Sequence, residues 1–237
     1  MKVLAVDTSS IVATVAILED DKLIGEYVLN HKKTHSQKLM PIISEIMLSA
    51  ELKASDIDVF AVAIGPGSFT GLRIGVATVK GLAHAVNRPV VGISTLDGLA
   101  YNMPFCRHII CPIMDARRRQ VYNALYRWVD DDLMIIEAPR ALALEQLIQE
   151  LKEKNEKVVF TGDGVEAFKD MLSAGLGDLC AFAPASVRMQ KASSIAQLAL
   201  RKALRGETES YLTLAPFYLR KSQAEREYEQ RCCGKSQ

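Results

Sequence analysis

The same order of expected elements occurs twice along the 237-residue chain. In each half a short apolar strand ends in an aspartate, Asp7 or Asp115, and two more strands and a helix follow. A fourth strand then runs into a glycine turn and a second helix, and these turns begin at Gly65 and Gly162. The two aspartates and the two turns are separated by similar stretches of chain, which indicates a duplicated α/β unit.

The break between the repeated units falls at Met103-Pro104-Phe105, where the pattern stops and restarts. We therefore expect an N-terminal subdomain over residues 1–103 and a second subdomain over residues 104–192. A helix over residues 193–205 is expected to pack back on the first half, and residues 206–220 form a final segment. The charged, apolar-poor residues 221–237 are predicted to be a mobile tail.

Composition favours a chain with a substantial core that works inside the cell. Hydrophobic residues make up 49%, and 29 Lys and Arg balance 28 Asp and Glu, so no net charge attracts nucleic acid or an anionic membrane. The five cysteines include no CxxC pair, which is typical of a reducing compartment. The first apolar run is too short for a signal peptide, and we expect a cytoplasmic protein with no membrane partner.

The segment GPGSFTGLRIGVATVKGLA (residues 65–83) joins an apolar strand to a helix. Its first amides could cradle an anion, with Arg73 adding charge, although the spacing is not that of a P-loop. Alternatively, its small residues form a smooth stripe on which another helix can lie, and we favour this interpretation. The stripe comprises Gly71, Gly75, Thr78, Gly81 and Ala85.

Two polar turns follow the strands that end in aspartate. Asp7, Thr8 and Ser9 could hold a phosphate or a metal-bound water, or they could simply form a turn. Asp115 leads into Arg117, Arg118 and Arg119, which could contact a phosphate, an RNA backbone or a carboxylate. A solvated basic turn is the alternative for these arginines.

Several motifs together resemble the TsaB (YeaZ) family of bacterial proteins, and the match covers nearly the whole chain. They are VDTS (6–9), HSQKLMP (35–41), GPGSFTGLRIG (65–75), GISTLDGLA (92–100), MDARRRQVY (114–122) and APFYLR (215–220). The resemblance implies a duplicated actin/Hsp70/sugar-kinase-like (ASKHA) fold with two βββαβα-type halves, in agreement with the repeated order.

The resemblance also implies a role in forming N6-threonylcarbamoyladenosine (t6A) at position 37 of tRNAs that read ANN codons. The chain would be a non-catalytic partner and activator of a TsaD-like catalytic paralogue, with a TsaE-like ATPase in the assembly and tRNA reached through the complex. No intrinsic cofactor is implied, and ATP or ADP would be held, if at all, at a partner interface.

Catalytic relatives carry an HxxxH metal motif, which falls here on residues 95–99. Its two histidine positions hold Thr95 and Leu99, neither of which is a ligand for iron or zinc. We therefore expect no metal and no activity of the chain alone. An M22-type metallopeptidase-like protein and an autonomous ASKHA ATPase are the alternatives. The ATPase would bind nucleotide or phosphate through Asp7, Thr8, Ser9 and Asp115.

The family resemblance places the partner surface on the helices expected at residues 35–50 and 70–86. An isolated chain would form a homodimer through the same surface. The predicted interface residues are Leu39, Ile42, Ile43, Ile46, Gly71, Arg73, Gly75, Thr78 and Gly81.

Overall fold

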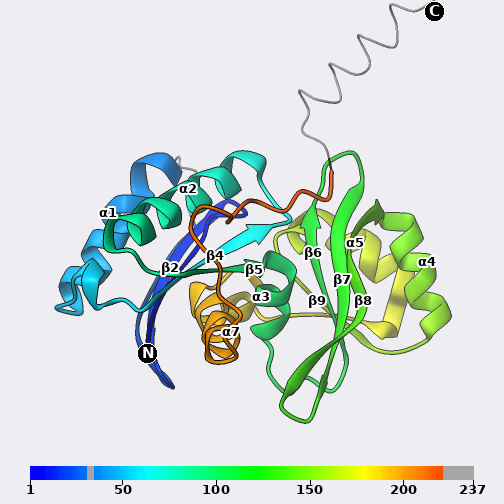
Figure 1. Cartoon of the computed structure of the whole chain (residues 1–237). Helices are drawn as coiled ribbons and strands as arrows, with labels where there is room; N and C mark the ends of the chain where they lie inside the picture. The colour runs from blue at the N-terminus through cyan, green and yellow to red at the C-terminus, as the bar shows by residue number, and fades with distance from the viewer. Residues whose placement is uncertain (31–34, 221–237) are drawn as a thin grey trace, which may run out of the picture.

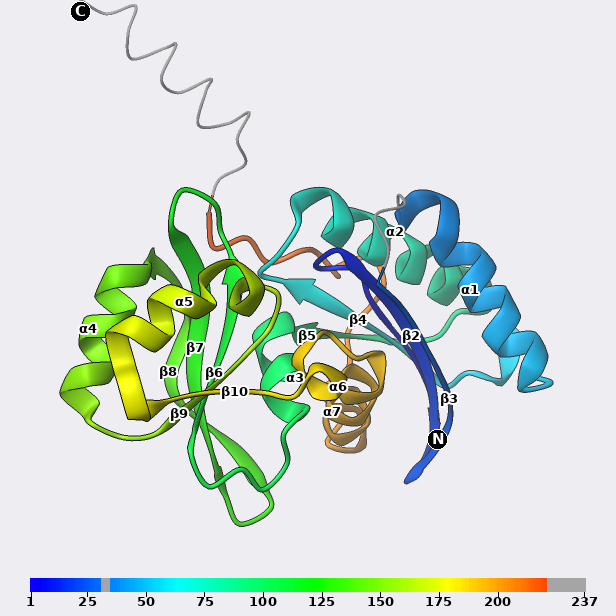
Figure 2. The same ribbon diagram turned by 180° about the vertical axis from the view of Figure 1, so that it is seen from behind.

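The computed structural model describes residues 1–30 and 35–220, and the predicted tail of residues 221–237 lies outside them. Two five-stranded sheets stand side by side with helices around them (Figures 1 and 2). The first half contains β1 (Lys2–Asp7), β2 (Val12–Glu19), β3 (Lys22–Asn30), α1 (His35–Ser49), a 3-10 turn (Ala54–Asp56), β4 (Val59–Gly65), α2 (Phe69–Val86), β5 (Val90–Ser94) and α3 (Thr95–Tyr101).

The second half repeats this order and continues into the helices that end the fold. It contains β6 (Ile109–Asp115), β7 (Gln120–Val129), β8 (Asp132–Ala143), α4 (Leu144–Lys154), β9 (Val158–Thr161), α5 (Gly164–Leu176), a 3-10 turn (Gly177–Leu179), β10 (Cys180–Phe182), α6 (Ala185–Arg188) and α7 (Ala192–Leu204).

The two sheets have the same topology. The first has the order β3-β2-β1-β4-β5 and the second the order β8-β7-β6-β9-β10. In each sheet the first three strands pair antiparallel, and the last two run parallel to the first strand of that half. The duplicated ASKHA-type fold is confirmed. The sequence reading missed β10, the counterpart of β5.

The first sheet is covered on both faces, which explains why β1 is apolar along its whole length. Leu4 and Val6 point to the cluster under α1 and α2, whereas Val3 and Ala5 point to the cluster under α7. Helix α7, late in the sequence, thus lies on the first sheet (Figure 1).

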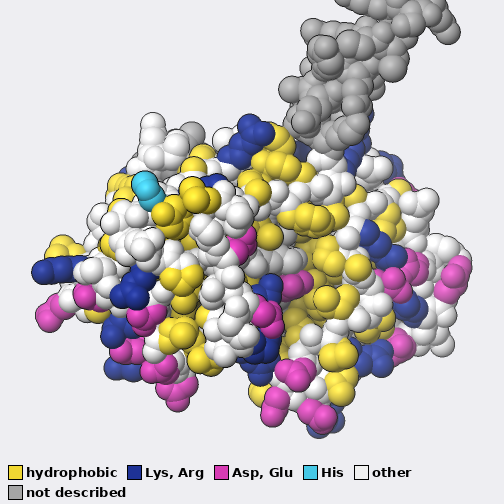
Figure 3. Space-filling model, in the orientation of Figure 1, with side chains coloured by type: hydrophobic (Ala, Val, Ile, Leu, Met, Phe, Trp, Pro, Cys, Tyr) yellow, Lys and Arg dark blue, Asp and Glu magenta, His cyan; other side chains and the backbone are white. Residues whose placement is uncertain are grey.

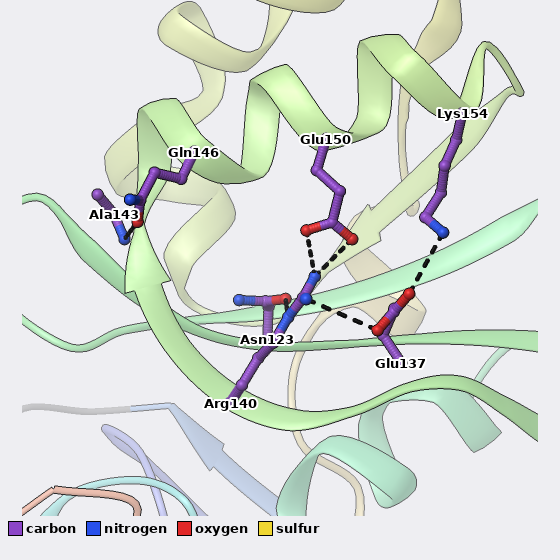
Figure 4. A network of polar contacts seen from close by, with 7 residues as sticks. All are labelled: Asn123, Glu137, Arg140, Ala143, Gln146, Glu150 and Lys154. Atoms are coloured by element: carbon purple, nitrogen blue, oxygen red, sulfur yellow. Dashed lines mark hydrogen bonds and ion pairs between the residues drawn. The ribbon is translucent and has the colours of Figure 1, made fainter.

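In the second half, α4 and α5 cover one face of the sheet, and α3 of the first half packs on the other. A polar network fixes α4 to this sheet (Figure 4). Arg140 on β8 donates two hydrogen bonds to Glu150 on α4, at 2.6 and 2.7 Å, and one to Asn123 on β7 at 3.3 Å. Glu137 joins Arg140 to Lys154.

The final segment, residues 206–220, runs over the first half and reaches the second. Glu209 exchanges backbone hydrogen bonds with Val90, and the amide of Phe217 donates to the carbonyl of Ile64 at 2.7 Å. Arg220 then donates to the carbonyl of Ala116, at 2.8 Å, in the second half. Within the described residues, no helix is both long enough and apolar enough to span a membrane.

Candidate functional site

The turn after β1 lies directly beneath the glycine-rich turn that begins α2. The hydroxyl of Thr8 donates to the carbonyl of Gly71 at 2.8 Å, and the amide of Ser68 donates to the carbonyl of Ser9 at 2.6 Å. Thr8 and Ser9 are completely buried. Both side chains are thus enclosed within their own chain, and the phosphate role expected for this turn stays a prediction.

The glycines of this segment are needed for that contact within the chain. A Cβ atom on Gly67 would overlap with the carbonyl oxygen of Ser9, and one on Gly71 with that of Thr8. A Cβ atom on Gly75 would overlap with the Thr8 hydroxyl. The prediction that Gly71 and Gly75 lie on a partner surface is therefore wrong, because both pack against the β1–β2 turn.

The exposed face of α2 coincides with the predicted stripe only in the later part of the helix, at Gly81 and Ala85. Arg73, Ala77, Gly81 and Ala85 are exposed at four-residue spacing, and Thr78 is half-buried beside them. A Cβ atom on Gly81 would meet no atom within 4 Å. Of the residues predicted for an interface on α2, Arg73, Thr78 and Gly81 thus lie where a partner can reach them.

On α1 the apolar face that was assigned to a partner belongs to the core. Leu39, Ile42, Ile43 and Ile46 are at most 6% exposed and pack with β1, β2 and β4. Their predicted interface role is wrong, because helical periodicity shows that a face is buried but not what covers it. The exposed face of α1 contains Met40, Pro41, Ser44 and Leu48 instead, and Leu48 is 80% exposed.

Arg73 is held in place by the final segment. Its guanidinium lies 4.0 Å from the centre of the Phe69 ring, and its Nε donates to the hydroxyl of Tyr218 at 3.1 Å. The rings of Phe69 and Tyr218 stack at 4.4 Å. This group places a fixed positive charge at the first turns of α2.

Three aspartates from both halves come together where the turns after the strands meet. Asp7 and Asp115 end β1 and β6, and Asp163 lies in the second glycine turn. Burial, together with the charges of Asp115 and Asp7, raises the pKa of Asp163 to about 6, against backbone hydrogen bonds that lower it. Burial also raises the pKa of Asp7 to about 6, against hydrogen bonds from Ser9 that lower it.

Asp163 was missed by sequence reasoning, although its position in the second glycine turn was a usable signal. Its Oδ1 is buried and has no hydrogen-bond partner among the described residues. Within residues 1–30 and 35–220, no group of three or more His, Cys, Asp or Glu side chains could hold a metal ion. The nucleotide or phosphate role of Asp7 and Asp115 stays a prediction.

The arginine turn between β6 and β7 has an uncommon backbone. Arg117, Arg118 and Arg119 have φ angles of 65°, 55° and 55°, in the left-handed region that side chains other than glycine seldom adopt. Arg117 pairs with Asp115 and Arg119 with Glu145, whereas Arg118 has no partner among the described residues. All three are exposed.

The positions that correspond to a metal motif in catalytic relatives are buried on α3. Thr95 and Leu99 are at most 1% exposed, and Leu99 packs in the cluster between α3 and the second sheet. Asp97, between them, accepts a hydrogen bond from Tyr126 of β7 at 2.6 Å. Asp97 thus connects the two halves.

The repeated sheet order, with an aspartate at the end of the first strand of each half, defines a protein of the actin/Hsp70/sugar-kinase-like class. A family model described as TsaD, tRNA N6-adenosine threonylcarbamoyltransferase, matches residues 22–228. Two curated relatives carry the name tRNA threonylcarbamoyladenosine biosynthesis protein TsaB. The Bacillus subtilis protein is 35% identical over 95% of this chain and 96% of its own length, and the Escherichia coli protein is 27% identical over 94% and 96%.

Solved structures from Pseudomonas aeruginosa share the fold. A protein described as uncharacterized, with similarity to peptidase YeaZ, has a TM-score of 0.78 and 25% identity, over 92% of this chain and 99% of its own. A structure described as YeaZ has a TM-score of 0.75 and 24% identity, over 92% of this chain and 100% of its own. The chain belongs to the TsaB family, and its domain is of the TsaD type.

Proposed function

We propose that this chain is a non-catalytic partner subunit in the formation of N6-threonylcarbamoyladenosine in tRNA. The observation that carries the proposal is the 35% identity with a relative named for this biosynthesis, which extends over nearly the full length of both chains. The TsaD-type domain supports assembly with a TsaD-like transferase in a tRNA-modifying complex. A cytoplasmic site of action follows from the same role.

The assignment as a partner subunit rests on the residues at the metal-motif positions. Thr95 has a hydroxyl and Leu99 has no polar atom, and both are buried in contacts with their own chain. Iron and zinc need imidazole, thiolate or carboxylate ligands at fixed geometry. The chain would therefore support chemistry that the TsaD-like partner carries out. The same residues weigh against the peptidase alternative.

The exposed face of α1 and α2 is the surface that we assign to this partner. Its apolar residues include Met40 and Leu48, which are 45% and 80% exposed, and the small residues Ala77 and Gly81 let a partner helix approach closely. Figure 3 shows mostly hydrophobic and uncharged side chains over α2. Exposed apolar patches of this kind mark interaction sites, and an isolated chain would homodimerise here.

The other components of the assembly would contact other surfaces of the chain. The arginine turn of residues 117–119 offers a contact for tRNA or another polyanion. A TsaE-like ATPase would join the complex, and ATP or ADP would be held where partner surfaces meet. An autonomous ATPase of the same fold is the second candidate, and the observation that favours it is the grouping of the buried Asp7 with the half-buried Asp115 and Asp163.

A binding experiment with matched variants tests the assigned surface. Leu48→Asp and Gly81→Trp should abolish or strongly weaken copurification with the TsaD-like paralogue, while the unfolding midpoint of each variant stays near that of the parent chain. Leu204→Asp is the control, because Leu204 is 69% exposed on α7, away from this face. Undiminished binding by both interface variants would contradict the assignment.

A further inference from the structure

A hollow of about 530 Å³, which we call the hinge hollow, lies beside the first connection between the two halves. Its walls come from the first connection between the halves, from the end of β7 and from α7. The lining residues used below are Tyr101, Phe105, Trp128, Lys191, Gln197 and Arg201. The volume is within the range of small-molecule sites, which is about 300–1,000 Å³.

One wall of this hinge hollow is aromatic. The Trp128 ring lies 5.3 Å from that of Tyr101 and 5.7 Å from that of Phe105, in tilted arrangements. Phe105 is 66% exposed and has a φ of 59°, a costly combination for a bulky apolar residue. Strained residues persist where the surrounding structure holds them, and they are concentrated at functional sites. The aromatic wall thus offers ring faces to a planar group.

The other wall provides polar groups that are not used within the chain. Lys191 precedes α7 and Gln197 lies on it, and neither side chain has a partner among the described residues. Arg201, by contrast, is already bound to Asp132 at 3.1 Å and lies 6.0 Å from the Tyr101 ring centre. Lys191 is therefore the available positive charge, and the Gln197 amide offers a donor beside an acceptor.

We propose that the hinge hollow binds a small organic anion built on a planar heterocycle, of the size of a nucleoside monophosphate. The heterocycle stacks on Phe105 and Trp128, its polar edge bonds to Gln197, and its anionic group pairs with Lys191. RNA fits less well. Asp131 also lines the hollow, between Asp130 and Asp132 in the sequence, and Lys191 offsets the charge of one anionic group but not that of the repeated phosphates of a polyanionic backbone.

Such a ligand would contact both halves at once, since Gln197 lies on α7, which packs on the first sheet and which Lys191 precedes, and Trp128 belongs to the second sheet. Its binding would favour the relative orientation of the halves that the structure shows. This site is separate from the aspartates Asp7, Asp115 and Asp163, none of which lines the hollow.

Trp128 is the only tryptophan in the chain, so its fluorescence reports directly on the hinge hollow. The full chain is titrated with AMP, with adenosine and with ribose 5-phosphate, and dissociation constants are checked by calorimetry. AMP should change the fluorescence saturably, adenosine should bind about tenfold more weakly because it lacks the charge, and ribose 5-phosphate should leave the signal unchanged.

Two variants locate the binding. Lys191→Met should weaken AMP about tenfold and leave adenosine unaffected, whereas Phe105→Ala should weaken both at least fivefold through the loss of stacking. Neither side chain belongs to the core, so both variants should fold, and Lys22→Met on β3 is the matched control. The proposal is overturned if AMP does not bind at millimolar concentration, or if both variants bind it like the parent chain. Tighter Phe105-dependent binding of a single-stranded RNA oligonucleotide than of AMP would also overturn it.

Discussion

The hydroxyl of Tyr126 on β7 donates a hydrogen bond of 2.6 Å to Oδ1 of Asp97 on α3, and this bond joins the two halves of the fold. Burial raises the pKa of Asp97, and the hydrogen bond from Tyr126 lowers it. Burial and the neighbouring Asp97 charge raise the pKa of Tyr126. The tyrosine therefore remains protonated and acts as the donor.

Removal of this donor should destabilise the fold. Tyr126→Phe leaves the Asp97 carboxylate buried without its partner, and we expect a loss of about 1–3 kcal/mol in the free energy of unfolding by urea denaturation. Tyr27→Phe on β3 is the control, because Tyr27 is 37% exposed. Equal stabilities of the two variants would show that the bond does not hold the halves together.

The buried aspartates predict a decrease in stability as the pH rises. Asp7 and Asp163 have folded pKa values of about 6, above the ordinary value of 3.8, so the folded state binds more protons than the unfolded state between these values. Their stabilising effect is complete below about pH 4 and is lost as the pH rises through 6.

Asp163→Asn removes one of these groups and should flatten the decrease between pH 4 and 7. It should also raise the unfolding free energy at pH 7 by about 1–3 kcal/mol, because the charge of Asp163 itself is removed. Asp170→Asn, at an exposed position on the same helix, should leave the profile unchanged. A profile for Asp163→Asn that is as steep as the parent's would contradict the assigned titration.

Two glycines of α2 should respond in opposite ways to alanine. Gly71→Ala places a Cβ atom against the Thr8 carbonyl, and we expect a loss of at least about 2 kcal/mol in chemical denaturation. Gly81→Ala enters open space and should be neutral or stabilise the helix by up to about 1 kcal/mol. Similar losses at both positions would show that Gly81 also packs within the chain.

The arginine turn offers a test that separates function from folding. Arg118 has a positive φ, which glycine adopts without strain. Arg118→Gly should therefore leave the free energy of unfolding unchanged or raise it by up to about 1 kcal/mol. If Arg118 contacts tRNA, the complex that contains the variant should bind tRNA more weakly. The slope of its log binding constant against log salt concentration should also be smaller by about one, since one phosphate contact is lost. Unchanged affinity and salt dependence would assign the turn to solvent.

The sequence predicted the fold more completely than the site, for reasons visible in particular residues. Apolar runs and paired glycine turns identified both halves, but β10 has only three residues, too few for a periodic pattern. The spacing of Leu39 and Ile43 predicts an apolar face on α1. It does not predict whether a strand of the same chain, here β2, or a partner protein covers that face. A glycine such as Gly71 indicates that another part of the protein approaches the backbone closely. Only the fold shows that this neighbour is the carbonyl group of Thr8.

The account depends most on a partner role exerted through the exposed face of α1 and α2. The direct measurement is the t6A content of tRNA, by mass spectrometry, in cells depleted of this chain and supplied with the parent chain, Gly81→Trp or Leu204→Asp. The parent chain and Leu204→Asp should restore the modification, and Gly81→Trp should not. Full restoration by Gly81→Trp, or normal t6A in the depleted cells, would contradict the account.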